Sequence, residues 1–145
     1  MLHTHSRIWI HLIWATKYRE RILHKDISKG LFEFLISKAK EVNIPFESLN
    51  IELEHIHGLI DLPTDKTVAD FMKSIKGSSS HMLNQQFFKT NFAWQRGYGA
   101  YSVSASQLIV VKNYIANQQE HHNIKTFTEE YDAWVKEYGI FDDKK

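Results

Sequence analysis

Apolar residues dominate residues 7–15, which include β-branched and aromatic side chains but no glycine or proline. This pattern predicts a β-strand. Because apolar residues occupy both faces of the alternating pattern, the strand either is central in a sheet or pairs across an interface. A basic loop at residues 16–21 follows it.

The next element is predicted to be a helix, capped by Asp26 or Ser28 and running to about Val42. Residues 46–62 are too many for one average strand of about five or six residues. We therefore expect a hairpin there that turns within residues 50–54, although no Asn-Gly pair marks the turn.

A second helix is expected after Thr67 and Asp70, which resemble a capping box. Residues 77–80 are expected to interrupt or bend this helix, because they are one glycine and three serines. The pattern then predicts a short strand at residues 100–103, preceded by the aromatic turn at residues 94–99.

A third helix is predicted from the capping box of Ser104 and Gln107 to about His121, and a last one at residues 128–138. The order of elements is then β-α-β-β-α-β-α-α. This order indicates an α+β fold, an α/β sandwich with helices packed on a central antiparallel sheet.

Composition narrows the functional classes. The 145 residues fit one domain, 1–145, and a formal charge of +1 excludes a histone-like basic protein. The absence of cysteine excludes disulfide scaffolds, thiolate zinc sites and cysteine nucleophiles. Apolar runs are far short of the about 18 residues of a membrane span, and the N-terminus does not resemble a signal peptide. We therefore expect a cytoplasmic protein without membrane contact.

His55 and His57 are two residues apart on a predicted strand, so their side chains point to the same face. Two imidazoles at this spacing can converge on one metal ion, but a third ligand must then come from elsewhere. The alternative is a pair of polar residues on a solvated strand face.

Tyr114 and Gln118 are four residues apart on the third predicted helix, so they are neighbours at the edge of its apolar stripe. An amide oxygen is a suitable ligand for Mg²⁺ or Mn²⁺. A tyrosine nucleophile needs a nearby metal or base, because its pKa near 10 leaves little phenolate at neutral pH. Alternatively, Tyr114 is a boundary aromatic and Gln118 a surface residue.

Several segments together resemble one family, the single-tyrosine HUH transposases of bacterial insertion sequences and their REP-associated relatives. HUH denotes His, a bulky apolar residue and His, which here is His55-Ile56-His57. The other matching segments are TKYR at 16–19, IKGSSS at 75–80, WQRGYGAYSVS at 94–104 and YIANQQEHH at 114–122. The resemblance covers nearly the whole chain in the order of the family.

The resemblance implies a ferredoxin-like HUH fold in which Tyr114 attacks a phosphate of single-stranded DNA, forms a 5′-phosphotyrosine link and frees a 3′-OH. It implies that His55, His57 and Gln118 bind Mg²⁺ or Mn²⁺. The implied substrates are element ends folded as imperfect hairpins, and the implied assembly is a homodimer whose active sites combine residues of both subunits. Glu54 stands where the family commonly has aspartate.

A set of basic, hydroxyl and aromatic residues is expected to contact DNA, because such side chains bond phosphates and stack on bases. Its members are Lys17, Arg19, Arg21, Lys73, Lys76, Ser78, Arg96 and Tyr98. The alternative for each is an ordinary solvated side chain.

These observations predict a metal-dependent transposase that cleaves and rejoins single-stranded DNA. The alternatives are a domesticated relative that no longer moves an element and a non-catalytic DNA-hairpin-binding protein. We also expect the homodimer to form by pairing of residues 7–15 with their symmetry mate, because this segment is apolar on both faces.

Overall fold

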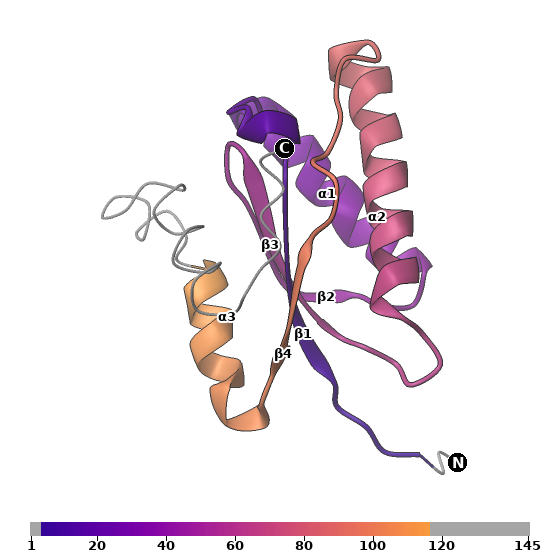
Figure 1. Ribbon diagram of the computed structural model, residues 1–145, viewed down its shortest axis with the longest axis vertical. Coiled ribbons are helices and arrows are strands. Elements are labelled where there is room, and N and C mark those ends of the chain that lie inside the picture. Colours follow the sequence, from indigo (N-terminus) through magenta and orange to yellow (C-terminus); the bar gives the residue numbers. More distant parts are fainter. Residues whose placement is uncertain (1–3, 117–145) are drawn as a thin grey trace.

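The computed structural model describes residues 4–116, and Figure 1 shows the order of their elements. The strands and α-helices are β1 (Trp9–Ala15), α1 (Lys25–Glu41), β2 (Phe46–Ile51), β3 (His55–Asp61), α2 (Val68–Leu83), β4 (Gly99–Val103) and α3 (Leu108–Ala116). Three short helical turns are η1 (Lys17–Arg19), η2 (Asn84–Phe88) and η3 (Ala105–Gln107). The predicted helix at 128–138 and the end of the third predicted helix lie outside the described residues.

The four strands form one antiparallel sheet in the order β2-β3-β1-β4. The predicted α+β fold with a central antiparallel sheet is thus confirmed, and β1 is central. The expectation that β1 pairs with its symmetry mate is wrong, because β3 and β4 already occupy its two hydrogen-bonding edges. A homodimer stays a prediction, and its interface must involve other elements.

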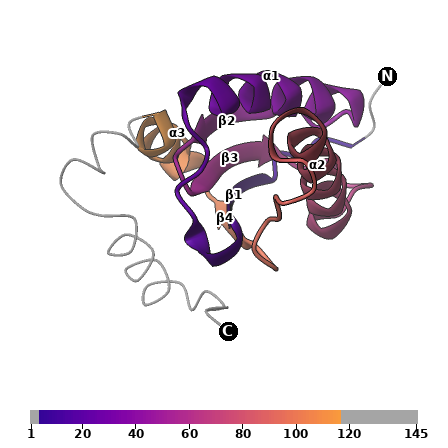
Figure 2. The ribbon, with the colours of Figure 1, turned by 90° about the horizontal axis from the view of Figure 1, so that it is seen from above.

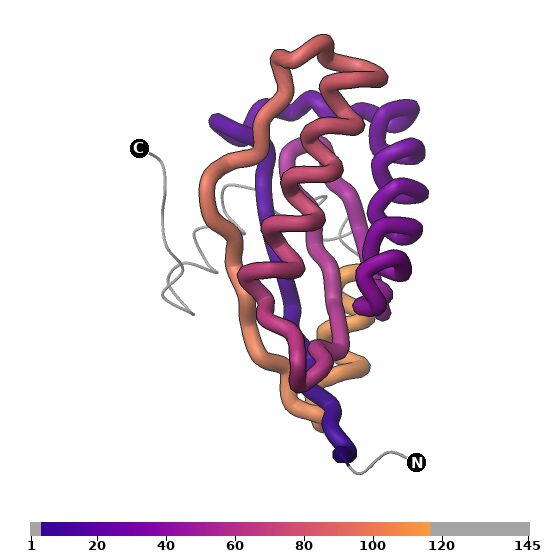
Figure 3. The backbone as a smooth tube through the Cα atoms, turned by 90° about the vertical axis from the view of Figure 1, so that its right-hand side faces the viewer, coloured from indigo at the N-terminus to yellow at the C-terminus, as the bar shows by residue number. Residues whose placement is uncertain are grey.

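The helices divide between the two faces of the sheet. Figure 2 shows α3 on the opposite side of the sheet from α2. In Figure 3, α2 lies in front of the strands and α1 runs along the right-hand edge, with α3 behind the strands. Alternate residues of each strand therefore face different layers.

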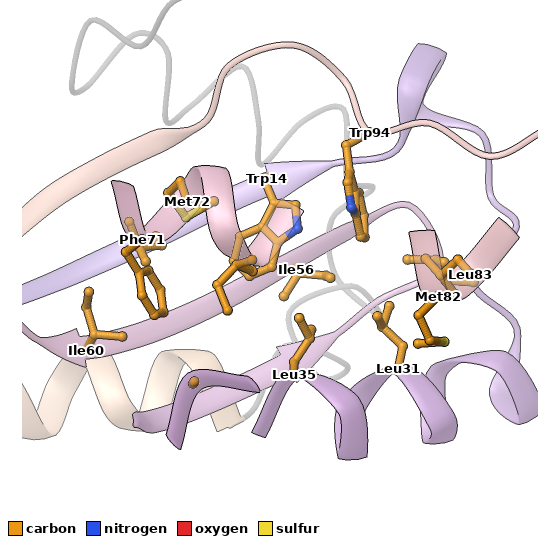
Figure 4. Packing of buried hydrophobic residues seen from close by; sticks show 14 of the residues in the cluster. Trp14, Leu31, Leu35, Ile56, Ile60, Phe71, Met72, Met82, Leu83 and Trp94 are labelled. Carbon is orange, nitrogen blue, oxygen red and sulfur yellow. The ribbon is translucent and has the colours of Figure 1, made fainter. Parts of the chain in front are cut away.

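The hydrophobic core lies between the sheet and the pair α1 and α2 (Figure 4). Even-numbered residues of β1 and β3 supply its sheet side, including Leu12, Trp14, Ile56 and Ile60, which are almost fully buried. The helices contribute Leu31, Leu35, Ala39, Phe71, Met72, Ile75, Met82 and Leu83. Because the core uses one face of β3, the odd-numbered histidines point to the other.

The structure confirms two local predictions. The hairpin turns between Ile51 and His55, within the predicted span. Thr67 caps α2, with its side-chain oxygen accepting a hydrogen bond from the amide of Asp70 at 3.1 Å.

The predicted N-terminal caps of two other helices are wrong, whereas α1 ends beside Val42 as predicted. The N-cap of α1 is His24, without a side-chain cap bond, and the hydroxyl of Ser28 donates to the carbonyl of Lys25. Ser104 precedes a 3-10 turn and makes no side-chain cap bond; its hydroxyl instead lies 3.1 Å from that of Ser106. Local side-chain bonds thus replace the expected caps.

The expected interruption at residues 77–80 is also wrong, because α2 is one continuous helix from Val68 to Leu83. The hydroxyls of Ser78, Ser79 and Ser80 donate to carbonyls of their own helix. Ser79 is buried and accepts a hydrogen bond from the indole Nε1 of Trp94 at 3.0 Å. Tertiary packing therefore outweighs the weak helix propensity of this segment.

We predict opposite effects for two glycine-to-alanine substitutions. In Gly58→Ala, the new Cβ would lie 2.7 Å from Cε1 of Phe46. The Phe46 ring is packed between Trp14 and Phe71, with centroids at 6.5 and 5.6 Å, so it has little room to move. We expect the free energy of unfolding to fall by about 1–3 kcal/mol, measured by urea denaturation.

Gly77→Ala is the matched control. Apart from its chain neighbours and the backbone of its own helix, no atom lies within 4 Å of a Cβ added there, and the residue is exposed inside a helix. We expect the free energy of unfolding to rise by about 0.5–1 kcal/mol. Equal effects of the two substitutions would contradict the packing described for Phe46.

Candidate active site

His55 and His57 lie on β3, on the face that α3 covers. Both are buried, at 0% and 2% exposure, so they are not polar residues on a solvated face. Their ring centroids are 5.0 Å apart. The two imidazoles therefore lie side by side, in surroundings shielded from water.

Glu54 orients His55. Its Oε1 lies 3.0 Å from Nδ1 of His55, and its Oε2 accepts a hydrogen bond from Nη1 of Arg21 at 2.6 Å. The Glu54 side chain is 3% exposed, so this carboxylate is held between a cation and an imidazole. A carboxylate behind a histidine is the arrangement that fixes the ring for metal coordination through Nε2.

His11 makes the corresponding contact with His57. Its Nε2 lies 2.8 Å from Nδ1 of His57, and both rings are buried. Burial lowers the pKa of the His11 imidazole from 6.5 to about 4, so this ring is neutral at pH 7. No motif in the sequence marks His11 as a site residue, because its contact with His57 depends on the register of β1 against β3.

Tyr114 reaches the same site from α3. Its ring centroid lies 5.6 Å from that of His57 and 6.3 Å from that of His11. Asn50, which is paired with His57 across the β2–β3 ladder, donates from Nδ2 to the carbonyl of Ile115 at 2.9 Å. This bond ties the tyrosine helix to the strand beside the histidines.

Gln118, the third predicted metal ligand, lies outside the described residues. Among residues 4–116, no group of three or more His, Asp or Glu side chains is placed to hold a metal ion.

The basic loop at 16–21 packs beside the start of β3. The amide of Thr16 donates to the carbonyl of Glu54 at 2.9 Å, and the amide of Lys17 donates to the carbonyl of Ala93 at 3.0 Å. The amide of Gln95 donates to the carbonyl of Ala15 at 2.8 Å. Three segments that are distant in sequence, 16–21, 54–57 and 93–97, therefore meet at one end of the sheet.

Within this region, Tyr18 is 75% exposed and was not among the predicted DNA contacts. It and Arg19 both have left-handed backbone angles, with φ of 59° and 54°. Such angles are uncommon outside glycine. The amide of Tyr18 donates to Oε1 of Gln95 at 2.9 Å, which holds the loop in this conformation.

The predicted DNA contacts differ in their surroundings. The exposed ones are Lys17, Lys73, Arg96 and Tyr98, while Arg19 and Ser78 are half-buried. Arg21 is exposed but pairs with Glu54. Lys76 donates from Nζ to the carbonyls of Gln95 and Gly97, both at 2.8 Å, so it fastens the 94–97 turn to α2.

No helix among residues 4–116 has the length and apolar character needed to cross a membrane.

Comparison with known proteins gives consistent matches. The chain is 26% identical over 117 residues to the ISDra2 transposase TnpA of Deinococcus radiodurans, covering 76% of this chain and 83% of the relative. It is 28% identical over 126 residues to the transposase for insertion sequence element IS200 of Salmonella typhimurium, covering 83% and 82%.

Two solved structures share the fold. A crystal structure of a candidate transposase from Deinococcus radiodurans superposes with a TM-score of 0.68 at 26% identity, over 81% of this chain and 95% of that one. A REP-associated tyrosine transposase bound to a REP hairpin superposes with a TM-score of 0.63 at 16% identity, over 84% and 74%.

The profile of the family described as "Transposase IS200 like" matches residues 4–118, which include both strand histidines, Tyr114 and Gln118. This match covers most of the chain, and the sheet with its three helices is the transposase fold of the two solved structures. The chain therefore belongs to the IS200-like transposase family.

Proposed function

We propose that this transposase cleaves and rejoins single-stranded DNA with Tyr114 as its nucleophile. The observation that carries the proposal is the contact between Tyr114 and the buried histidines, with ring centroids of Tyr114 and His57 5.6 Å apart. The tyrosine and the histidines come from different layers of the fold. The hydrogen bond from Asn50 to the carbonyl of Ile115 holds the tyrosine helix, and the contact of Glu54 with Nδ1 of His55 holds the histidine.

In the cleavage step, Oη of Tyr114 bonds to the phosphorus of a DNA phosphodiester, and the bond from phosphorus to the 3′-oxygen breaks. The phenol loses its proton and the leaving oxygen gains one, so the products are a 5′-phosphotyrosine and a free 3′-OH. The ester retains the energy of the phosphodiester. A 3′-OH from another strand end can therefore reverse the step and join new DNA.

His55 and His57, with Gln118 as a third ligand, would hold Mg²⁺ or Mn²⁺. The donor set fits, because imidazole nitrogens and an amide oxygen suit such an ion and each Nδ1 is engaged by Glu54 or His11, which would direct Nε2 to the metal. A bound ion would polarise the scissile phosphate and stabilise its developing charge. Glu54 and His11 would keep the two rings oriented.

We propose further that the site forms within one chain. The ring contact joins Tyr114 and His57 of the same molecule. The family resemblance alone favoured an active site shared between subunits, whereas this geometry favours assembly in cis.

The proposed DNA surface is centred on the end of the sheet where residues 16–21 and 93–97 meet. Lys17, Arg19 and Arg96 would neutralise phosphates there. Tyr18 and Tyr98 expose aromatic rings on which unpaired bases can stack. A REP-associated relative with the same fold binds a REP hairpin, which supports a hairpin-ended single strand as the partner.

The test is a covalent adduct assay with end-labelled single strands containing imperfect hairpins and randomised flanks, in Mn²⁺. We expect the 3′-label, and not the 5′-label, to migrate with denatured protein, because the tyrosine retains the 5′-phosphate of the downstream fragment. Tyr114→Phe should reduce the adduct at least 10³-fold, since only the attacking oxygen is lost. EDTA should abolish it in the wild type.

Tyr101→Phe is the matched control, because Tyr101 lies on the same face with its ring centroid 6.3 Å from that of His11. It should retain the adduct. An adduct in Tyr114→Phe would refute the nucleophile assignment and direct the search to Tyr98, Tyr101 and Tyr131. Hairpin binding without any adduct in the wild type would favour the non-catalytic alternative.

Lys73 and Lys76 offer a second prediction, because they lie three residues apart on α2. Lys76→Ala removes both hydrogen bonds to the 94–97 turn, so the free energy of unfolding should fall by about 1–3 kcal/mol. Lys73→Ala should change it by less than about 0.5 kcal/mol but weaken hairpin binding and make the salt dependence shallower. Chemical denaturation and fluorescence anisotropy give the two readouts.

An unfolding free energy unchanged by Lys76→Ala would contradict the structural role of that lysine. Hairpin affinity and salt dependence unchanged by Lys73→Ala would remove Lys73 from the DNA surface.

A further inference from the structure

A buried histidine that belongs to none of the matching motifs lies against one of the two proposed metal ligands. His11 is on β1, two residues from Ile13, and Ile13 pairs directly with His57 in the antiparallel ladder. His11 and His57 are therefore diagonal neighbours on one face of the sheet, a distance that long side chains can bridge. Their facing nitrogens are 2.8 Å apart.

We propose that His11 is a positioning residue that fixes the tautomer and orientation of His57 for metal binding. The proposal rests on the metal site described under the proposed function. It goes beyond that site because His11 itself would neither coordinate the ion nor touch the DNA.

The hydrogen bond between the two rings decides which nitrogen carries the proton. Two neutral imidazoles joined through Nε2 of His11 and Nδ1 of His57 need one donor and one acceptor. When Nε2 of His57 coordinates a metal, its proton must be on Nδ1, so His57 donates and His11 accepts. His11 then carries its own proton on Nδ1. The opposite assignment would place a proton on the nitrogen that coordinates.

The surroundings of His11 restrict its movement. The residue is 2% exposed and belongs to the central strand, which is paired on both edges. Tyr101 and Tyr114 contact it edge-on, with ring centroids at 6.3 Å each. An acceptor held this firmly can select one ring orientation of His57, as Glu54 does for His55.

Two variants distinguish the effect of the hydrogen-bond acceptor of His11 from the effect of the packing of its ring. His11→Gln keeps a hydrogen-bond acceptor on a side chain of similar reach, whereas His11→Phe keeps a planar ring and removes both nitrogens. Each is compared with the wild type by Mn²⁺ titration calorimetry without DNA. We expect the dissociation constant for Mn²⁺ to be about 10- to 100-fold larger in His11→Phe than in the wild type. In His11→Gln it should be larger by about threefold or less. Thermal unfolding without metal checks that both variants fold.

The second measurement is the tautomer of His57 in the metal-free wild type, from long-range ¹H–¹⁵N NMR correlations. The proposal predicts the proton on Nδ1 of His57 and on Nδ1 of His11. In His11→Phe, the His57 proton should move to Nε2. Because the wild-type measurement needs no variant, it tests the proposal even if His11→Phe does not fold.

The proposal is overturned if the His57 proton is on Nε2 in the wild type. It is also overturned if His11→Phe binds Mn²⁺ as tightly as the wild type, or if His11→Gln loses as much affinity as His11→Phe. Failure of the metal assignment itself gives a different result, which is a wild-type protein with no Mn²⁺ binding. Failure of the nucleophile assignment is seen only in the adduct assay.

Discussion

The antiparallel pairing of β1 with β3 is the constraint on which the rest of the site depends. Its register places the side chains of the two strands in two environments. Even-numbered residues pack against α1 and α2, and odd-numbered residues face α3. A shift by one residue would exchange the core residues and the histidines. The apolar packing of Leu12, Trp14, Ile56 and Ile60 thus also fixes where His11, His55 and His57 point.

This division provides a rigid, shielded site without placing it on a flexible loop. The histidines are buried on strands, and Nε2 of His55 and of His57 would bind a ligand or ion only on the side of the sheet that α3 covers. Hydrogen bonds supply orientation: Glu54 to His55, His11 to His57, and Asn50 to the backbone of α3. Preorganisation matters for the proposed chemistry, because a free tyrosine side chain has a pKa near 10 and a metal can assist its attack only in a fixed geometry.

Much of this arrangement follows from local patterns in the sequence. Period-two alternation places His55 and His57 on one face of a strand, and the family resemblance singles out Tyr114. Contacts that depend on strand register cannot be predicted from such local patterns. The partners of His11 and Asn50 follow from strand pairing, and no marker such as an Asn-Gly turn indicates that pairing in the sequence.

Competition between local and tertiary bonds explains other differences between the predicted and the observed structure. Gly77 and the three serines after it predict an interruption of the helix. The burial of Ser79 against Trp94 nevertheless keeps α2 continuous. Arg21 and Lys76, which are predicted DNA contacts, also bond the protein itself, and these bonds could not be foreseen from the sequence.

Anomalous diffraction from crystals grown with Mn²⁺ tests the proposal that the sheet histidines and Tyr114 of one chain form a single metal-dependent site. We expect one peak within coordination distance of Nε2 of both His55 and His57, with Tyr114 of the same chain facing it and His11 still bonded to His57. A peak elsewhere, no peak at the histidines, or a peak on Nδ1 of His57 with His11 displaced would contradict it.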